Sequence, residues 1–195
     1  MSSIYNLHYF ESENSDILNI ILNWFNDTSK SEFISLLFDY CKKNNQSVVS
    51  FDYEFQYLNQ DTSSWSELEV ESNTLDQIIK KYAWKYKKIN FIAKSLWAIV
   101  VSKYLSKHKL EKEYTIKILW YIHDEIDMTS YINKVSVIQW ERDRFWSPEE
   151  ISKKIQDKYW TKVDILAIPW WDHSYRNEDK TSLVWQELII QFIIL

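Results

Sequence analysis

Glycine is absent from this chain of 195 residues. An average frequency near 7% would place about 14 glycines in a chain of this length. Tight turns and helix ends often need a positive φ, where any side chain beyond hydrogen is penalised. A compact fold built without glycine must therefore place other residues at those positions. The absence also excludes a collagen-like sequence.

Cysteine, proline and long apolar runs are also scarce. The chain has one cysteine, Cys41, and two prolines. A lone cysteine excludes an internal disulfide framework and fits a reducing compartment, so we expect a cytoplasmic protein. No apolar run reaches the roughly 18 residues of a membrane span, and the N-terminal residues lack the pattern of a secretory signal. We therefore expect no membrane association.

The charged residues are mixed along the chain rather than gathered in blocks. There are 23 basic and 28 acidic side chains, which leave a net charge of −5. This balance, without a basic block, argues against a nucleic-acid partner. With 46% hydrophobic residues, the chain is long enough and apolar enough to bury a core. We predict one globular domain over residues 1–195.

Tryptophan is abundant where glycine is missing, with eleven residues in the chain. Trp84 and Trp160 directly follow helical stretches, where a helix often ends in glycine, and two adjacent tryptophans follow Pro169. We interpret most of the eleven as glycines encoded by UGA and rendered as tryptophan in the printed sequence. Trp120 and Trp185 fit this hypothesis least clearly. The alternative, a tryptophan-rich surface that binds carbohydrate, leaves the missing glycines unexplained.

Short apolar runs alternate with stretches of helical period. Candidate strands are residues 17–23, 47–51, 89–94, 115–119, 134–139 and 163–168. Candidate helices are residues 31–43, 75–83, 96–108, 147–159 and 182–195. Mostly apolar strands indicate a sheet covered on both faces. The alternation predicts an α/β fold with a doubly wound, mostly parallel sheet and right-handed crossovers.

Two helix starts carry capping signals. Ser147, Pro148 and Glu150 have the residue types of an N-cap, a first helical residue and a capping-box partner. Thr74 and Gln77 have the capping-box spacing, which predicts a helix from residue 75. The polar residues 59–73 before it are predicted to form a surface loop.

Ligands bind such sheets beyond the carboxyl ends of the strands, so the residues after each strand matter most. Residues 93–97, Ala-Lys-Ser-Leu-Trp, lie between a predicted strand and a predicted helix. With glycine at 97, this is the small-x-Ser-x-Gly pattern of a nucleophile elbow, whose sharp turn exposes the serine hydroxyl. An indole at 97 would crowd that turn. A serine at a helix start is also a common N-cap, which is the alternative for Ser95.

An acid and a histidine follow two later strands. Asp143 comes after the strand at 134–139, and His173 after the strand at 163–168. Serine needs a histidine to take its proton, and the histidine needs an acid to hold its tautomer. The alternative to the role of Asp143 as the acid is that of a turn residue that bonds its own backbone. Glu141 is a less favoured candidate for the acid, and we interpret Asp172, next to His173, as a loop residue that points away from the site.

The oxyanion of acyl transfer needs backbone donors. The Leu96 N–H, at the start of the predicted helix, is one candidate, and the Phe25 N–H, after the first predicted strand, is the other. No metal-ligand spacing and no phosphate-binding loop is present, so we expect neither a metal nor a cofactor.

Four segments resemble the small, lidless α/β-hydrolases related to dienelactone hydrolase, a group that includes the testis-expressed hydrolase-like proteins. They are residues 22–25, Leu-Asn-Trp-Phe, residues 93–98, Ala-Lys-Ser-Leu-Trp-Ala, residues 139–150, Gln-Trp-Glu-Arg-Asp-Arg-Phe-Trp-Ser-Pro-Glu-Glu, and residues 170–175, Trp-Trp-Asp-His-Ser-Tyr. The resemblance implies Ser95 as nucleophile, Asp143 as acid and His173 as base. It departs from the family's glycine at Ala93 and from its histidine at Asn23.

These residues together predict a serine hydrolase with a minimal α/β-hydrolase fold and no lid domain. Its expected partner is a small-molecule acyl compound such as an ester. The alternative is a non-catalytic interaction module that keeps the fold and has lost turnover. The residues indicate no oligomeric state.

Overall fold

A computed structural model describes residues 4–23, 28–58, 68–121, 126, 135–143, 145–169 and 186–194. Its strands are β1 (Ile4–Phe10), β2 (Ile17–Leu22), β3 (Ser47–Tyr53), β4 (Lys88–Lys94), β5 (Glu113–Leu119), β6 (Val135–Trp140) and β7 (Asp164–Ile168). They form one sheet in the spatial order β1-β3-β2-β4-β5-β6-β7. Every neighbouring pair is parallel except β1 with β3. The predicted α/β fold with a mostly parallel sheet is confirmed.

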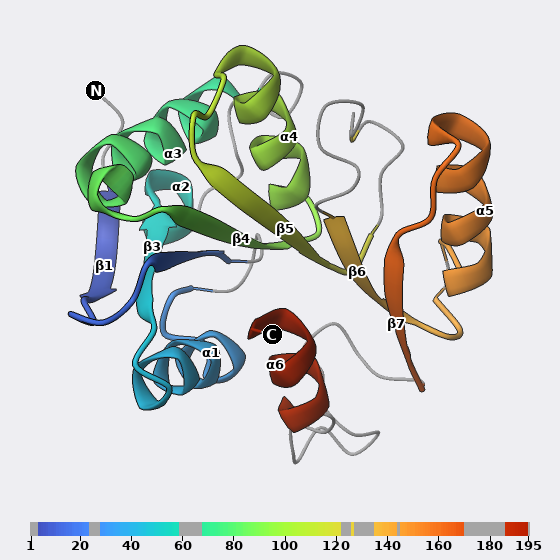
Figure 1. The fold of residues 1–195 in the computed structure, drawn as a ribbon, viewed down its shortest axis with the longest axis horizontal. Coiled ribbons are helices and arrows are strands. Elements are labelled where there is room, and N and C mark those ends of the chain that lie inside the picture. Colours follow the sequence, from blue (N-terminus) through green and yellow to red (C-terminus); the bar gives the residue numbers. More distant parts are fainter. Residues whose placement is uncertain are drawn as a thin grey trace.

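Helices cover both faces of this sheet (Figure 1). They are α1 (Glu32–Lys43), α2 (Glu54–Tyr57), α3 (Glu69–Tyr82), the 3-10 helix η1 (Ala83–Lys85), α4 (Trp97–Lys107), α5 (Pro148–Tyr159) and α6 (Gln186–Ile194). The side chains of α1 and α6 pack into the core on one face, and those of α3, α4 and α5 into the core on the other. Among these helices, none is both long and apolar enough to cross a membrane.

Burial on both faces explains the apolar character of the strands. Along β2, Leu18, Ile20 and Leu22 belong to the core beneath α3 and α4, whereas Ile21 belongs to the core beneath α1 and α6. All four side chains are fully buried. Because neither face meets water, the strand has no exposed polar row, and its sequence is a nearly continuous apolar run.

One polar row does cross the sheet, on the face covered by α6. Asn19 lies opposite Asn90 in the β2–β4 register, and Asn90 lies opposite Thr115 in the β4–β5 register. The Asn90 Nδ2 group donates to Asn19 Oδ1 at 2.9 Å and to the Ile193 carbonyl at 3.3 Å. The Thr115 hydroxyl donates to Asn90 Oδ1 at 2.9 Å. Since buried polar groups require partners, this row ties α6 to the sheet.

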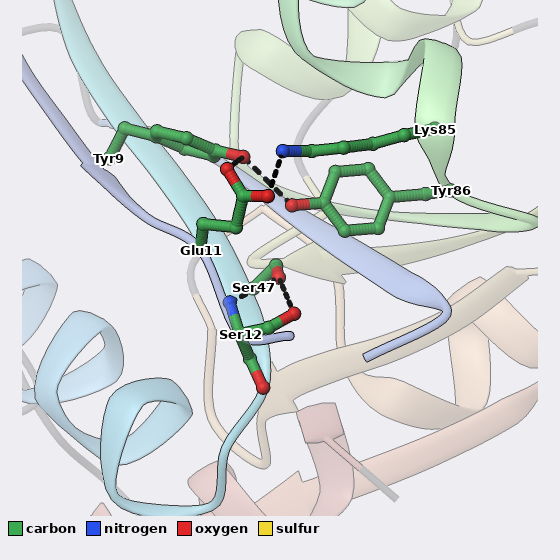
Figure 2. Close-up of polar contacts among 6 residues, drawn as sticks. All are labelled: Tyr9, Glu11, Ser12, Ser47, Lys85 and Tyr86. Atoms are coloured by element: carbon green, nitrogen blue, oxygen red, sulfur yellow. Dashed lines mark hydrogen bonds and ion pairs between the residues drawn. The ribbon is translucent and has the colours of Figure 1, made fainter. Parts of the chain in front are cut away.

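The antiparallel edge strand β1 is not among the predicted strands, because its side chains are half-buried and lack a clear alternation. Polar side chains hold its end, as Figure 2 shows. The hydroxyls of Tyr9 and Tyr86 lie 2.8 Å apart, Tyr9 donates to the Glu11 carboxylate at 3.1 Å, and Lys85 pairs with Glu11. The Lys85 ammonium lowers the pKa of the Glu11 carboxyl. This cluster joins β1 to η1, near the amino end of β4.

The helix predicted at residues 75–83 begins earlier, because α3 starts at Glu69. Thr74 is therefore not an N-cap, and the prediction of a capping box there is wrong. Its hydroxyl donates to the Val70 carbonyl at 2.9 Å inside the helix. The first turn of α3 is polar, so it shows no apolar period, although the buried Leu68 precedes it. Of the predicted loop at 59–73, residues 59–67 lie outside the described residues.

The start of α5 is the best defined helix boundary. Ser147 is the N-cap, with Pro148 as the first helical residue. The Glu150 N–H donates to Ser147 Oγ at 3.2 Å, and the Ser147 N–H donates to Glu150 Oε2 at 2.7 Å. Both halves of the predicted capping box are thus present.

We predict that Ser147→Ala lowers the free energy of unfolding by about 1 kcal/mol, because the first turn of α5 loses its capping acceptor. Ser152→Ala, the same substitution within α5, is the control. It should cause no loss, because alanine has the higher helix propensity. Urea denaturation of the two variants and the parent measures both effects. Equal stabilities of the two variants would contradict the prediction.

Candidate active site at the carboxyl edge of the sheet

The carboxyl ends of β4, β5, β6 and β7 are joined by backbone hydrogen bonds that continue past the strands. The Ser95 N–H donates to the Leu119 carbonyl at 2.8 Å, which links the end of β4 to β5. In the same way, Trp120 donates to Ile138 at 2.8 Å, which links the end of β5 to β6, and the residue after β6 donates to the last residue of β7. The first residues beyond the strands therefore lie in a row at one edge.

Ser95 forms the predicted sharp turn between β4 and α4. Its φ is 55°, in the left-handed region, which costs a residue with a side chain roughly 1–2 kcal/mol. Contrary to the exposure expected of such a turn, the residue is 1% exposed and its hydroxyl is buried, without a hydrogen-bond partner within the part of the chain that the structure describes. A strained strand–turn–helix with serine at its apex is the arrangement of a nucleophile elbow. The alternative role of helix N-cap does not apply, because Leu96 occupies that position without a capping side chain.

Leu96 lies at the N-terminal end of α4, with φ −50° and ψ −32°. The first N–H groups of a helix lack partners within the helix, and they carry the positive end of its dipole. An anion formed at Ser95 would therefore meet a favourable potential here. Phe25, the other predicted oxyanion donor, lies outside the described residues.

Trp97 is accommodated at the elbow, contrary to the expectation that an indole would crowd the turn. The ring turns into the core and stacks on Tyr53, with ring centres 4.4 Å apart, and on Phe55 at 5.7 Å. The side chain is fully buried, and its N–H has no hydrogen-bond partner among the described residues. An unpaired buried donor costs about 1–3 kcal/mol.

The Asp143 carboxylate is held by three donors. Oδ1 accepts the N–H groups of Phe145 at 2.8 Å and Trp146 at 3.1 Å. Oδ2 accepts the indole N–H of Trp120 at 2.5 Å. The first pair gives Asp143 the turn-forming role considered as an alternative, and the same bonds also fix the direction of the carboxylate. The neighbouring Glu141 is exposed.

Gln139 supports this acid loop, although the sequence analysis does not single it out. It is fully buried and lies one residue before the end of β6, a strand whose only other polar residue is Ser136. Its Oε1 accepts the Tyr121 N–H at 2.8 Å, and its Nε2 donates to the Trp146 carbonyl at 2.9 Å. One side chain thus connects the segment after β5 with the segment after β6. A long polar side chain near the carboxyl end of a mainly apolar strand is the signal that would have found it.

A second cluster of buried polar side chains lies at the ends of β2 and β3. Its central residue is Asp52, which no sequence pattern indicated. Its Oδ1 accepts the Ser29 N–H at 2.5 Å and the Asn23 side-chain amide at 3.1 Å, and its Oδ2 accepts the Asn6 amide at 2.7 Å. Asn23 also donates to the Phe51 carbonyl at 3.0 Å. The departure from the family pattern at Asn23 therefore serves a structural bond to β3.

His173 and Asp172 lie outside the described residues, and the structure places the other two predicted triad members, Ser95 and Asp143, after strands of the same sheet edge. Ser95 and Asp143 follow β4 and β6, and β5 separates these strands in the sheet. His173 follows β7 in the chain, and β7 is the neighbour of β6. Among the described residues, no group of His, Cys, Asp and Glu is arranged to hold a metal ion.

Solved structures share this architecture. An α/β serine hydrolase homologue from Coxiella burnetii superposes with a TM-score of 0.69 at 12% identity, covering 99% of this chain and 97% of its own. The chain has the α/β-hydrolase fold. A serine hydrolase without a lid from Xanthomonas campestris superposes with a TM-score of 0.68 at 11% identity, covering 100% and 93%.

Est1E from Butyrivibrio proteoclasticus, in a structure with bound ferulic acid, superposes with a TM-score of 0.67 at 12% identity, covering 97% of this chain and 94% of its own. No family model and no curated protein matches the sequence. At these low identities the similarity concerns the fold alone. The superposition covers nearly the full length of each of these neighbours.

We predict that Asp52→Ala lowers the free energy of unfolding by on the order of 3 kcal/mol, because buried donors lose their acceptor. Asp39→Ala, in the exposed face of α1, is the control and should change it by less than about 0.5 kcal/mol. Urea denaturation compares them. A loss at Asp52 no larger than at Asp39 would contradict a structural role for this carboxylate.

Proposed function

We propose that this protein is a serine hydrolase that cleaves a small carboxylic ester or a related acyl compound. Ser95 is the nucleophile, His173 the general base and Asp143 the acid that orients it. The observation that carries the proposal is the left-handed turn at Ser95, between β4 and α4 at the carboxyl edge of an α/β-hydrolase sheet. The fold neighbours described as serine hydrolases support it.

In the proposed reaction, Ser95 Oγ attacks the acyl carbonyl carbon while His173 takes the hydroxyl proton. The carbonyl oxygen becomes an oxyanion, held by the Leu96 and Phe25 N–H groups. The ester C–O bond breaks, and the alcohol leaves with the proton from His173. Water then attacks the acyl-enzyme by the same route, releasing the acid and restoring the serine. The Asp143 carboxylate stabilises the charged imidazole in both steps.

The proposed relationship is to the lidless hydrolases of the dienelactone hydrolase group. The structure of Est1E with ferulic acid shows that a neighbour of this fold binds a small carboxylic acid, which is the product class of ester cleavage. We also propose a cytoplasmic location, because the chain has a single cysteine and so no internal disulfide.

The glycine hypothesis is part of the proposal. Trp120 and Trp160 have φ values of 66° and 55°, in the left-handed region that glycine occupies without penalty. Trp160 is the residue after α5 and is 91% exposed, so nothing in the core requires an indole there. Trp84 differs from the expectation, because it lies within the right-handed η1. UGG codons at the eleven positions would end this hypothesis.

We predict that Trp160→Gly raises the free energy of unfolding by about 1 kcal/mol, because glycine relieves the left-handed strain. Trp84→Gly is the matched control: it also removes an exposed indole, from a right-handed helix, and should lower stability by up to about 1 kcal/mol. Urea denaturation resolves the two signs. If both variants had a lower free energy of unfolding than the parent, glycine would not be the residue that suits the backbone at position 160.

We predict that the chain with glycine at all eleven tryptophan positions reacts with a fluorophosphonate probe, and that Ser95→Ala abolishes this labelling. Ser106→Ala, at an exposed position of α4, is the control and should label like the parent. Gel fluorescence after timed labelling measures the rate. Labelling that persists in Ser95→Ala would refute the assignment, and a folded chain that never labels would favour the non-catalytic interaction module.

A further inference from the structure

Trp120 stands between the two described members of the proposed triad. It is the first residue after β5, the strand that separates β4 from β6. Its backbone is fixed from the β6 side by the bond from its N–H to the Ile138 carbonyl, and its φ is 66°. The position thus combines a left-handed backbone with a place in the row of residues that follow the strands. Residue 120 therefore lies at the same edge of the sheet as Ser95 and Asp143.

The indole of Trp120 does meet the proposed acid. Its N–H donates to Asp143 Oδ2 at 2.5 Å, while Oδ1 is already shared by two backbone N–H groups of the acid loop. Oδ2 is therefore the oxygen left for a histidine N–H. The ring is 2% exposed and stacks on Trp140, with ring centres 5.2 Å apart, and on Phe145 at 6.2 Å. A carboxylate oxygen can accept two hydrogen bonds, but this buried ring fills the space beside it.

We propose that residue 120 decides whether Asp143 can serve as the acid of the triad, and that Trp120 blocks it. The inference rests on the proposed function. With tryptophan, the indole N–H takes the oxygen that would orient the histidine. With glycine, the left-handed backbone is unstrained and Oδ2 is open. Position 120, one of the two that fit the glycine hypothesis least clearly, is thus a position where the absence of a side chain matters for the chemistry.

Three full-length folded chains, which differ only in the tryptophan that they keep, isolate the effect of residue 120. One has glycine at all eleven tryptophan positions, one keeps only Trp120, and one keeps only Trp160. The measured quantity is the second-order rate of labelling by a fluorophosphonate, with Ser95→Ala in each chain as the blank. We expect the chain with Trp120 to label at least about 100-fold more slowly than the other two, since disabling the acid of such a triad costs about 10⁴-fold.

A spectroscopic measurement tests the contact without relying on activity. In the chain that keeps only Trp120, Asp143→Asn replaces the carboxylate that the indole N–H contacts, so the tryptophan emission should shift. In the chain that keeps only Trp160, the same substitution should leave the emission unchanged. Trp160 is 91% exposed and follows the last turn of α5, a helix of 12 residues that begins near Asp143 and is about 18 Å long.

The outcomes separate this proposal from the proposed function. If the chain with Trp120 labels as fast as the all-glycine chain, or if its emission ignores Asp143→Asn, the block at residue 120 is refuted while Ser95 keeps its role. If the all-glycine chain shows no labelling that depends on Ser95, the hydrolase assignment itself fails. Slow labelling only with Trp120, together with the emission shift, supports the block.

Discussion

The parallel order of six strands is the constraint from which the chemistry of this fold follows. Because β3, β2, β4, β5, β6 and β7 run in one direction, their carboxyl ends share an edge. The strand hydrogen bonds continue for one residue past β4, β5 and β6, so the following segments begin at defined places. Serine and aspartate that lie far apart in the chain thereby come to one side of the sheet.

Buried polar side chains near the carboxyl ends of the strands stabilise this edge of the sheet. Gln139 connects the segments after β5 and β6, and Asp52 gathers donors from three separate parts of the chain. Such groups are stable only when their partners are in place, because an unpaired buried polar atom costs more than the bond contributes. The same bonds that complete the core therefore also restrict the segments that follow β5 and β6.

Side-chain volume at the turns is the second determinant of the site. Ser95, Trp120 and Trp160 have left-handed φ values, although each carries a side chain. Trp160 is exposed to solvent, whereas Trp97 is buried in a cluster with two other aromatic rings. The Trp120 side chain donates to the Asp143 carboxylate. A tryptophan therefore has different surroundings at each of these positions.

By itself, the sequence determined the α/β class, six of the seven strands, the start of α5 and the serine at a strand–helix turn. These features depend on local periodicity, on capping residues and on residues a few positions apart, which a sequence displays directly. The edge strand β1, the early start of α3, and the roles of Asp52, Gln139 and Trp120 were decided only in the tertiary structure. Each of them depends on a partner many residues away, and the folding of the sheet is what brings that partner within hydrogen-bonding distance.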